Sequence, residues 1–186
     1  SVDINAPAAV GNTTNTLPAP TSTEGYTCST SPSATLTVSS ATATNVTLNK
    51  AFVPATVNGG AVSEMQFLVD NTAVGSVALS GVTLTDNFPT GMVLSSNPNP
   101  RMLSGSCTVG SATSTPGATS FSITGATIPA NATCTLGVNV SSYLEGNLIN
   151  TIPASSIGSS QLATNSNSPS ATLTVLRNVG ISKYFS

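Results

Sequence analysis

The sequence predicts an all-β sandwich, and three observations support this prediction. First, hydrophobic and polar residues alternate over much of the chain, which is the period of a β-strand with one buried face. Second, the 186 residues are 39% hydrophobic and only 5% charged, so a core can form while Ser, Thr and Asn supply most of the polar surface. Third, turn sequences separate short strands. About seven to nine such strands are typical of an immunoglobulin-like sandwich, with a jelly roll or another β-barrel as the alternative.

The expected strands follow one another from residue 45 onward. The first covers residues 45–52 and places Val46, Leu48 and Phe52 on one face. The later strands show alternating hydrophobic residues: Met65, Phe67 and Val69; Val82, Leu84 and Phe88; Phe121 and Ile123; Cys134, Leu136, Val138 and Val140; Leu148 and Ile152; and Ala171, Leu173 and Val175. Turn signals stand at "NGG" 58–60, "PTG" 89–91, "NPNP" 97–100, "TPG" 115–117 and "PAN" 129–131.

The chain contains an internal repeat. Three segments recur in the same order: "GNTTNTLPA" (11–19) as "GNLINTIPA" (146–154), "SPSATLTV" (31–38) without change (168–175), and "NVTLNKAF" (45–52) as "NVGISKYF" (178–185). Chance similarity among Thr-rich strands does not explain an eight-residue identity within this order. The chain is therefore interpreted as part of a tandem array.

The repeat also predicts the domain boundaries. Residues 1–44 would be the C-terminal strands of a preceding repeat, residues 45–176 a complete repeat, and residues 177–186 the first strand of a following one. Either the chain is a section of a longer array, or its end segments complete neighbouring molecules by strand addition. The expected partners are copies of itself or adjoining repeats, arranged head to tail.

A lysine lies on the hydrophobic face of the first strand of the complete repeat. Lys50 alternates with the hydrophobic residues of that strand, and a lysine is almost never fully buried without a partner. The same alternation turns Asp86 and Asn150 inward on two other strands. We therefore expect Lys50, Asp86 and Asn150 to meet inside the sandwich.

These three side chains are suited to forming an amide cross-link. A buried lysine can lose its proton and attack the side-chain carbon of Asn150, while a protonated Asp86 polarises the carbonyl and ammonia leaves. The prediction is a Lys50–Asn150 isopeptide bond that Asp86 promotes. Two alternatives stay open: a buried Lys50–Asp86 ion pair hydrogen-bonded to Asn150, and an exposed Lys50 on a misassigned face. By the repeat, Asn15 and Lys183 are the corresponding halves of sites in neighbouring units.

Two of the three cysteines lie on strand-like stretches of the complete repeat. Cys107 and Cys134 are expected to form a disulfide in an oxidising compartment, with two reduced core thiols as the alternative. Cys28 is left over, either free or paired outside the chain.

The composition argues against several classes of function. Four basic residues and a net charge of −2 cannot supply a nucleic-acid surface or a polybasic membrane surface, and no apolar run is long enough for membrane insertion. With no His and six scattered acidic residues, neither a metal site nor a common nucleophilic triad is expected. We expect no cofactor and no enzyme that acts on external substrates.

The stretch "NKAFVPATVNGGAVSEMQFLVDNTAVGSVALSGVTLTDNFPTGM", with "NTIP" from residue 150, resembles the bacterial conserved repeat domain known as domain of unknown function eleven. The most specific pieces are Lys50-x-Phe52-x-Pro54, Asp86-x-x-Pro89-x-Gly91 and Asn150-Thr151. The resemblance implies an immunoglobulin-like sandwich found in tandem in large secreted or surface-attached bacterial proteins. The trio is also similar to that of the isopeptide-forming domains of pilins and adhesins.

The function expected from the sequence is structural. The chain would be a repeat module of an extracellular fibre, filament or adhesin stalk on the bacterial cell surface. The alternative is an adhesive module that recognises a carbohydrate or a host surface through its loops.

Overall fold

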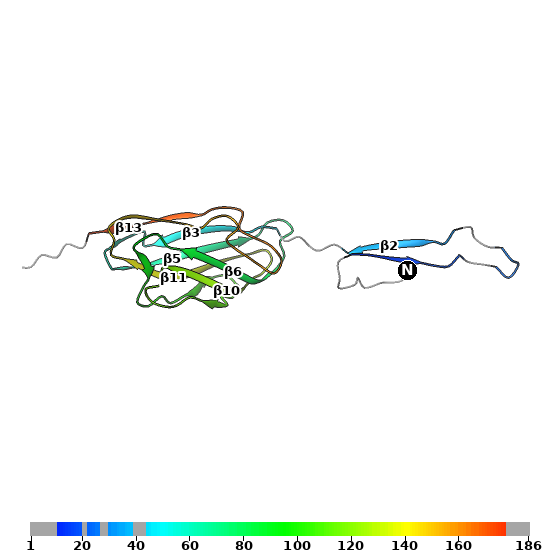
Figure 1. Cartoon of the computed structure of the whole chain (residues 1–186), viewed down its shortest axis with the longest axis horizontal. Helices are drawn as coiled ribbons and strands as arrows, with labels where there is room; N and C mark the ends of the chain where they lie inside the picture. The colour runs from blue at the N-terminus through cyan, green and yellow to red at the C-terminus, as the bar shows by residue number, and fades with distance from the viewer. Residues whose placement is uncertain (1–10, 20–21, 27–29, 39–43, 178–186) are drawn as a thin grey trace, which may run out of the picture. The chain divides into compact units, whose positions relative to one another are not determined.

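The computed structural model describes residues 11–19, 22–26, 30–38 and 44–177, and these residues form strands and no helix. It follows that no helix in this part of the chain could cross a bilayer. Contacts divide the chain into two units, Ser1–Ala41 and Thr42–Ser186 (Figure 1).

The smaller unit contains one antiparallel hairpin. It consists of β1 (Gly11–Thr16) and β2 (Ser33–Val38). Every side chain of β1 is exposed, so the described residues of this unit provide no core beneath the hairpin.

The larger unit contains the other strands of the described chain. They are β3 (Thr47–Val53), β4 (Thr56–Asn58), β5 (Val62–Asn71), β6 (Leu79–Asn87), β7 (Met92–Leu94), β8 (Arg101–Ser104), β9 (Ser111–Ala112), β10 (Ser120–Ile128), β11 (Ala132–Ser142), β12 (Gly146–Thr151) and β13 (Ser170–Leu176). Their alternating burial follows the alternation of the sequence, as in β6, where Val82, Leu84 and Asp86 are buried and their neighbours are exposed.

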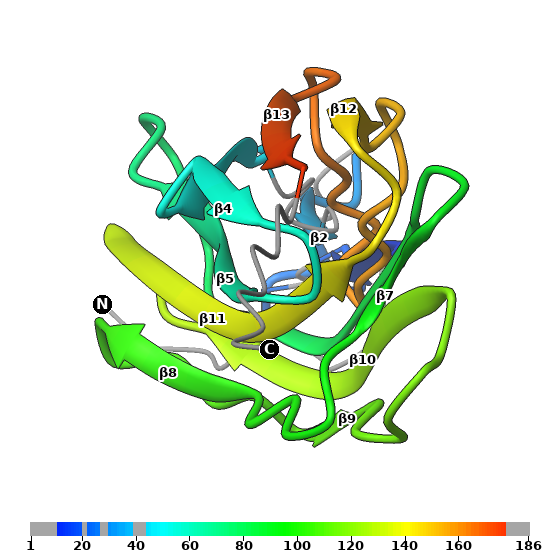
Figure 2. The same cartoon turned by 90° about the vertical axis from the view of Figure 1, so that its left-hand side faces the viewer.

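The strands of the larger unit form three sheets. One sheet has the order β3-β5-β11-β7, with β8 also paired to β11; the others have the orders β12-β13-β4 and β6-β10-β9. In the view of Figure 2, β4, β12 and β13 lie above β11. The first sheet faces both of the others across the core. Phe67 on β5 stacks on Phe121 of β10 with 5.7 Å between ring centroids, and Met65 on β5 contacts Asn150 of β12.

This arrangement confirms the predicted all-β, immunoglobulin-like sandwich. The predicted strands correspond to β3, β5, β6, β10, β11, β12 and β13, and their inward residues form one buried cluster. The short strands β4, β7, β8 and β9 were not expected individually. β3 and β4 show how the chain changes layer: β3 pairs with β5, whereas β4, after Pro54 and Ala55, pairs in parallel with β13.

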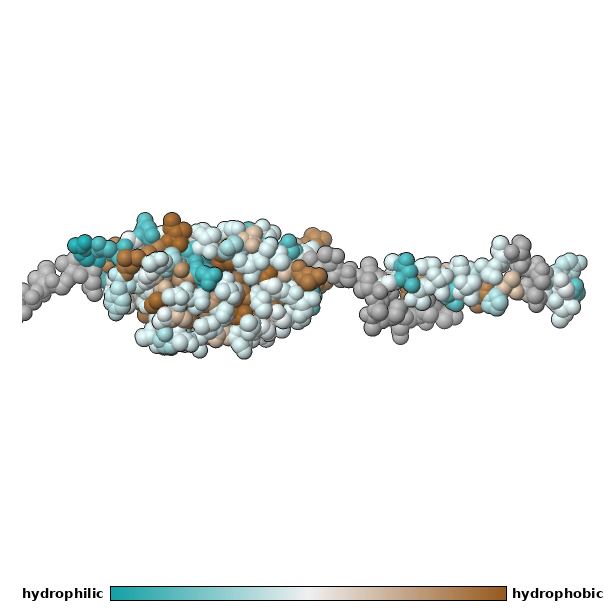
Figure 3. Space-filling view, in the orientation of Figure 1, coloured by the Kyte–Doolittle hydropathy of each residue, from teal (hydrophilic) through white to brown (hydrophobic). Residues whose placement is uncertain are grey.

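The surface of the larger unit is poor in charge. Figure 3 shows pale residues of intermediate hydropathy over most of the visible face of this unit, with a few strongly hydrophilic ones. Hydroxyl groups form cross-strand hydrogen bonds on this surface, for example between Ser104 and Thr135 at 3.1 Å and between Thr151 and Ser170 at 2.9 Å.

Candidate functional site

The structure brings Lys50, Asp86 and Asn150 together inside the sandwich. Lys50 comes from β3, Asp86 from β6 and Asn150 from β12, so each sheet of the larger unit contributes one residue. Each lies on its strand's inward face because it stands two positions from a buried hydrophobic residue of the same strand. The side chains of Lys50 and Asp86 are wholly inaccessible to solvent, and Asn150 is 1% exposed. Lys50 is therefore not on an exposed face.

One oxygen atom of Asp86 binds both nitrogen atoms of the trio. Lys50 Nζ donates to Asp86 Oδ2 at 2.5 Å, and Asn150 Nδ2 donates to the same oxygen at 2.9 Å. The amine and the amide nitrogen are thus held side by side on one carboxyl group. Asp86 can exchange a proton with either nitrogen.

Burial acts on the two ionisable groups in opposite directions. It lowers the pKa of Lys50 to about 8, although the nearby charge of Asp86 opposes the shift. It also raises the pKa of Asp86, against the opposing effects of Lys50 and of the hydrogen bond from Asn150. Both shifts reduce the preference for an ion pair over a neutral amine beside a neutral carboxylic acid.

Two buried oxygen atoms of the site have no hydrogen-bond donor among the described residues. They are Oδ1 of Asp86 and Oδ1 of Asn150. A carboxylate and an amide carbonyl are both acceptors, so neither can satisfy the other. A proton on Asp86 would turn its oxygen into a donor, and the amide carbonyl of Asn150 is an acceptor in the same site. Protonation of Asp86 would therefore add a donor to a site in which these two oxygens have none among the described residues.

Two core residues of β5 complete the surroundings of the trio. Met65 Sδ accepts a hydrogen bond from Asn150 Nδ2 at 3.5 Å, so both amide hydrogens of Asn150 have acceptors. Lys50 Nζ lies 5.2 Å from the ring centroid of Phe67, whose face excludes water from that side. The sequence indicated both residues as core but not as neighbours of the trio. The missing information was strand pairing, because Lys50 stands directly opposite Phe67 in the β3–β5 register.

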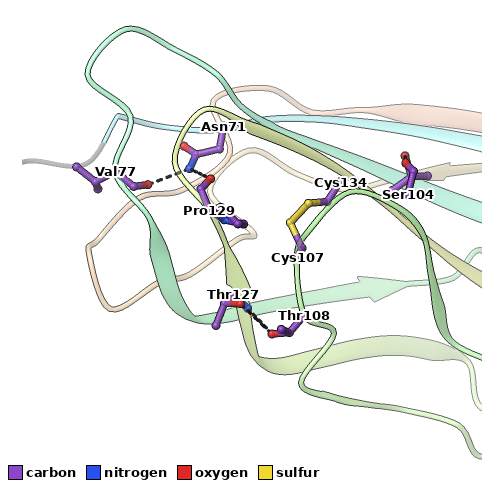
Figure 4. Close-up of a disulfide and its surroundings, with 9 residues drawn as sticks. Asn71, Val77, Ser104, Cys107, Thr108, Thr127, Pro129 and Cys134 are labelled. Atoms are coloured by element: carbon purple, nitrogen blue, oxygen red, sulfur yellow. Dashed lines mark hydrogen bonds between the residues drawn. A yellow bond between two sulfur atoms is a disulfide. The ribbon is translucent and has the colours of Figure 1, made fainter.

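A disulfide joins Cys107 to Cys134, with 6.0 Å between the Cα atoms (Figure 4). Cys134 belongs to β11, and Cys107 lies in the connection between β8 and β9. That connection is also tied to β10, because Thr108 and Thr127 exchange two backbone hydrogen bonds of 3.1 and 3.3 Å. Gly105 has a φ of 89°, and a Cβ there would lie 2.4 Å from the Thr133 carbonyl oxygen, so the connection requires glycine.

The other predicted residues belong to the smaller unit or fall outside the described residues. Asn15 is an exposed residue of β1 in the smaller unit. Cys28 and Lys183 fall outside the described residues. Among the residues that the structure describes, no group of three His, Cys, Asp or Glu side chains could hold a metal ion.

The comparison with protein families identifies the larger unit. The sequence model of one family, Domain of unknown function (DUF7933), matches residues 46–175. The chain belongs to this family. The DUF7933 match includes Lys50, Asp86 and Asn150. The resemblance to domain of unknown function eleven concerns nearly the same residues and stays a prediction.

Comparison with solved structures agrees on the fold. A cohesin module of a family 33 glycoside hydrolase from Clostridium perfringens ATCC13124 matches 74% of this chain and 99% of its own, with 11% identity and a TM-score of 0.51. At this identity the likeness shows the fold alone. The major pilin subunit BcpA of Bacillus cereus matches 92% of this chain and 49% of its own, with 10% identity and a TM-score of 0.43, too low to bear on the fold. No curated protein matches the chain in sequence.

Proposed function

We propose that the DUF7933 unit of this chain is a structural module of a bacterial extracellular fibre, filament or adhesin stalk, closed by a self-formed Lys50–Asn150 isopeptide bond. One observation carries the proposal: the Lys50 amine and the Asn150 amide nitrogen share one oxygen of the buried Asp86. In such a site, Lys50 Nζ can replace Nδ2 on Cγ of Asn150 with little movement. The reaction acts on the chain itself and has no external substrate.

The first step is a proton transfer within the site. Lys50 gives a proton to Asp86, which leaves a neutral amine beside a neutral acid. The raised pKa of Asp86 and the pKa of Lys50 near 8 both favour this step, and burial is the main cause of each shift.

The second step is attack of Lys50 Nζ on Cγ of Asn150. The acid proton of Asp86 is donated to Oδ1 of Asn150, the buried oxygen without a donor, and stabilises the charge that develops there. Asp86 then takes a proton from Nζ and passes it to Nδ2. The Cγ–Nδ2 bond breaks, ammonia leaves, and the proton on Oδ1 returns to Asp86 as the carbonyl re-forms. The product is a Cγ–Nζ amide, with no oxidant or co-reactant required.

The bond would join strands of different sheets. Lys50 lies on the first strand of the unit and Asn150 on the last but one, so the cross-link closes a loop of about 100 residues, for which chain entropy gives about 4–5 kcal/mol. The disulfide between Cys107 and Cys134 restrains a second, shorter loop and suits an oxidising extracellular location. A covalently closed unit is suited to a stalk or fibre that must remain folded.

The end segments extend the proposal to neighbouring units. Residues 1–44 and 177–186 would complete adjoining repeats, with Asn15 and Lys183 as halves of their cross-link sites. Copies of the unit would then follow one another head to tail, without a nucleic-acid or membrane partner. The same repeat motifs support a relationship with domain of unknown function eleven.

The intact mass of the folded protein under reducing conditions tests the proposal. We expect a deficit of one ammonia in the wild-type chain and no deficit in Lys50→Ala, Asp86→Ala or Asn150→Ala. As a matched control, Asn147→Ala changes an exposed asparagine of β12 and should keep the deficit. A wild-type mass without the deficit would leave the buried ion pair as the correct interpretation.

One feature of the surface favours the adhesive alternative. A groove lined by Ser95, Ser96 and Ser141 runs beside Tyr143, which is 85% exposed. The Tyr143 ring lies against Gly60, where a Cβ would come within 2.5 Å of it. An exposed aromatic ring beside hydroxyl groups suits a carbohydrate. If this groove binds glycans, Tyr143→Ala abolishes binding on a glycan array, and an array with no wild-type signal rejects the function.

A further inference from the structure

The β1–β2 hairpin reproduces the pairing of the β12–β13 hairpin. In β1–β2, Asn15 stands opposite Ala34; in β12–β13, Asn150 stands opposite Ala171. The two registers agree over all six residue pairs of each hairpin. Asn15 therefore occupies the position of Asn150 in structure as well as in sequence.

The agreement extends past the strands. The Leu17 amide donates to the Pro32 carbonyl at 3.0 Å, and the Ile152 amide donates to the Pro169 carbonyl at 3.0 Å. The two hairpins thus leave their paired region in the same way, although the intervening loops differ in sequence.

The two hairpins differ in what covers their inner faces. In β12–β13, Asn150, Ile152 and Leu173 are each no more than 1% exposed. The corresponding residues of the smaller unit are Asn15 on β1, Leu17 directly after β1, and Leu36 on β2. Asn15 is exposed, Leu17 is 59% exposed and Leu36 is only partly buried. The β1–β2 hairpin has the inner face of a sandwich, and the described residues of its unit supply no facing sheet.

We propose that this face of the β1–β2 hairpin docks in a second copy of the chain whose own β12–β13 hairpin has not yet docked and reacted, where Asn15 meets Lys50 and Asp86 of that copy. The inference rests on the proposed function and adds its partner. The surface beneath β12 is formed by β3, β5 and β6, because Asn150 contacts Met65 and Asp86 there and Asp86 binds Lys50. A hairpin of the same register and nearly the same inner residues fits that surface.

The chemistry of the second copy's site is unchanged. Lys50 Nζ of one chain bonds to Cγ of Asn15 of the other, the Cγ–Nδ2 bond of Asn15 breaks, and one ammonia leaves for each link. Neither β1 nor β2 carries a charged residue, so charge repulsion does not oppose the exchange. Two inner residues differ: Leu17 replaces Ile152 and is also hydrophobic, whereas Thr13 stands where Leu148 is 6% exposed. The difference at Thr13 disfavours β1–β2 against the chain's own hairpin.

The test is refolding of the full chain at high concentration, because exchange requires the place of β12–β13 to be open. In Asn150→Ala the chain's own hairpin cannot react. We expect covalent dimers or longer chains that resist reduction, with a mass deficit of one ammonia per link. The double variant Asn15→Ala/Asn150→Ala should give none. Adding Thr13→Leu to Asn150→Ala should raise the yield several-fold.

A second measurement does not depend on the bond. Native mass spectrometry of Asn150→Ala should show dimers that Leu36→Asp reduces at least tenfold, while Thr37→Asp, on the opposite face of β2, leaves them in place. The absence of covalent and non-covalent dimers would overturn the inference, and so would an Asn150→Ala monomer that loses ammonia through its own Asn15. If the wild-type monomer shows no ammonia deficit but Asn150→Ala still forms non-covalent dimers, the proposed cross-link is wrong and the docking surface stands.

Discussion

At the scale of single residues, the Lys50–Asp86 pair is costly to bury as ions. Both side chains are wholly inaccessible, and the carboxyl group has one oxygen without a donor in the described part of the chain. Burial of an ion pair often contributes little net stability, because desolvation offsets the attraction. A reaction that converts Lys50 into an amide removes this cost permanently.

The pH dependence of stability distinguishes a free Lys50 from a bonded one. Burial lowers the pKa of an unbonded Lys50 from 10.5 to about 8, and because Asn150 is not a cause of this shift we expect the same folded-state pKa in Asn150→Ala. Between these values the unfolded chain holds a proton that the folded chain lacks, so stability rises with pH, by up to about 3 kcal/mol. Bonded Lys50 does not titrate.

We therefore expect the free-energy gap between wild type and Asn150→Ala to narrow from pH 8 to pH 10.5 in denaturant titrations. The double variant Lys50→Met/Asn150→Ala should show no such rise relative to wild type. A constant gap would mean that Lys50 keeps an ordinary pKa when it is not bonded.

Met65 should act as a positioning residue for the cross-link. Its sulfur accepts the second amide hydrogen of Asn150 and so fixes the amide orientation. Met65→Leu keeps the volume and should cost less than about 1.5 kcal/mol of stability. It should nevertheless slow ammonia loss several-fold after refolding, followed by mass spectrometry. Met92→Leu changes a methionine that is 1% exposed on β7, outside the trio, and should leave the rate unchanged.

At the scale of elements, alternation in the sequence predicted the long strands and the inward direction of Lys50, Asp86 and Asn150. It did not predict β4, β7, β8 or β9, because two to four residues are too few to show a period.

Strand pairing was also beyond the sequence, and with it the contacts of Met65 and Phe67. The sequence also did not predict that the side chain of Asn167 caps the backbone of β3. The Leu48 amide donates to Asn167 Oδ1 at 3.0 Å, and Asn167 Nδ2 donates to the Leu48 carbonyl at 2.7 Å. An asparagine in a loop carries no sign that it will pair with the edge of a distant strand.

The disulfide should stabilise the connection between β8 and β9. Cys107 and Cys134 are 27 residues apart, a loop for which a disulfide typically contributes about 2–4 kcal/mol. The variant Cys107→Ser/Cys134→Ser should lose that amount in denaturant titration, and reduction of the wild type should match it. Because the proposed reaction uses no atom of the disulfide, ammonia loss should persist in this variant. Failure to cross-link would show that the disulfide also shapes the trio.

At the scale of the whole molecule, ion pairs contribute little to the larger unit. The exposed Arg177–Glu145 pair, with bonds of 2.9 and 3.0 Å, and the Arg101–Glu64 pair lie near the surface, where such pairs are screened and weak. Hydrophobic burial and covalent closure must supply the stability that charges do not.

The cross-link should dominate the stability of the unit. We expect Asn150→Ala to lose about 4–5 kcal/mol from loop closure. Asn147→Ala, exposed on the same strand, should stay within about 0.5 kcal/mol of wild type. Equal stabilities for wild type and Asn150→Ala would contradict a bonded Lys50.

The positions of Lys50 on β3 and Asn150 on β12 have a mechanical consequence. If the two are joined, tension applied through the ends of the unit enters at β3, crosses the amide and leaves through β12 and β13. The roughly 100 residues between them carry no load. Force therefore cannot extend this segment, whose fully extended length would be about 330–360 Å. A filament of such units would resist pulling like a chain of closed links rather than lengthening one domain at a time.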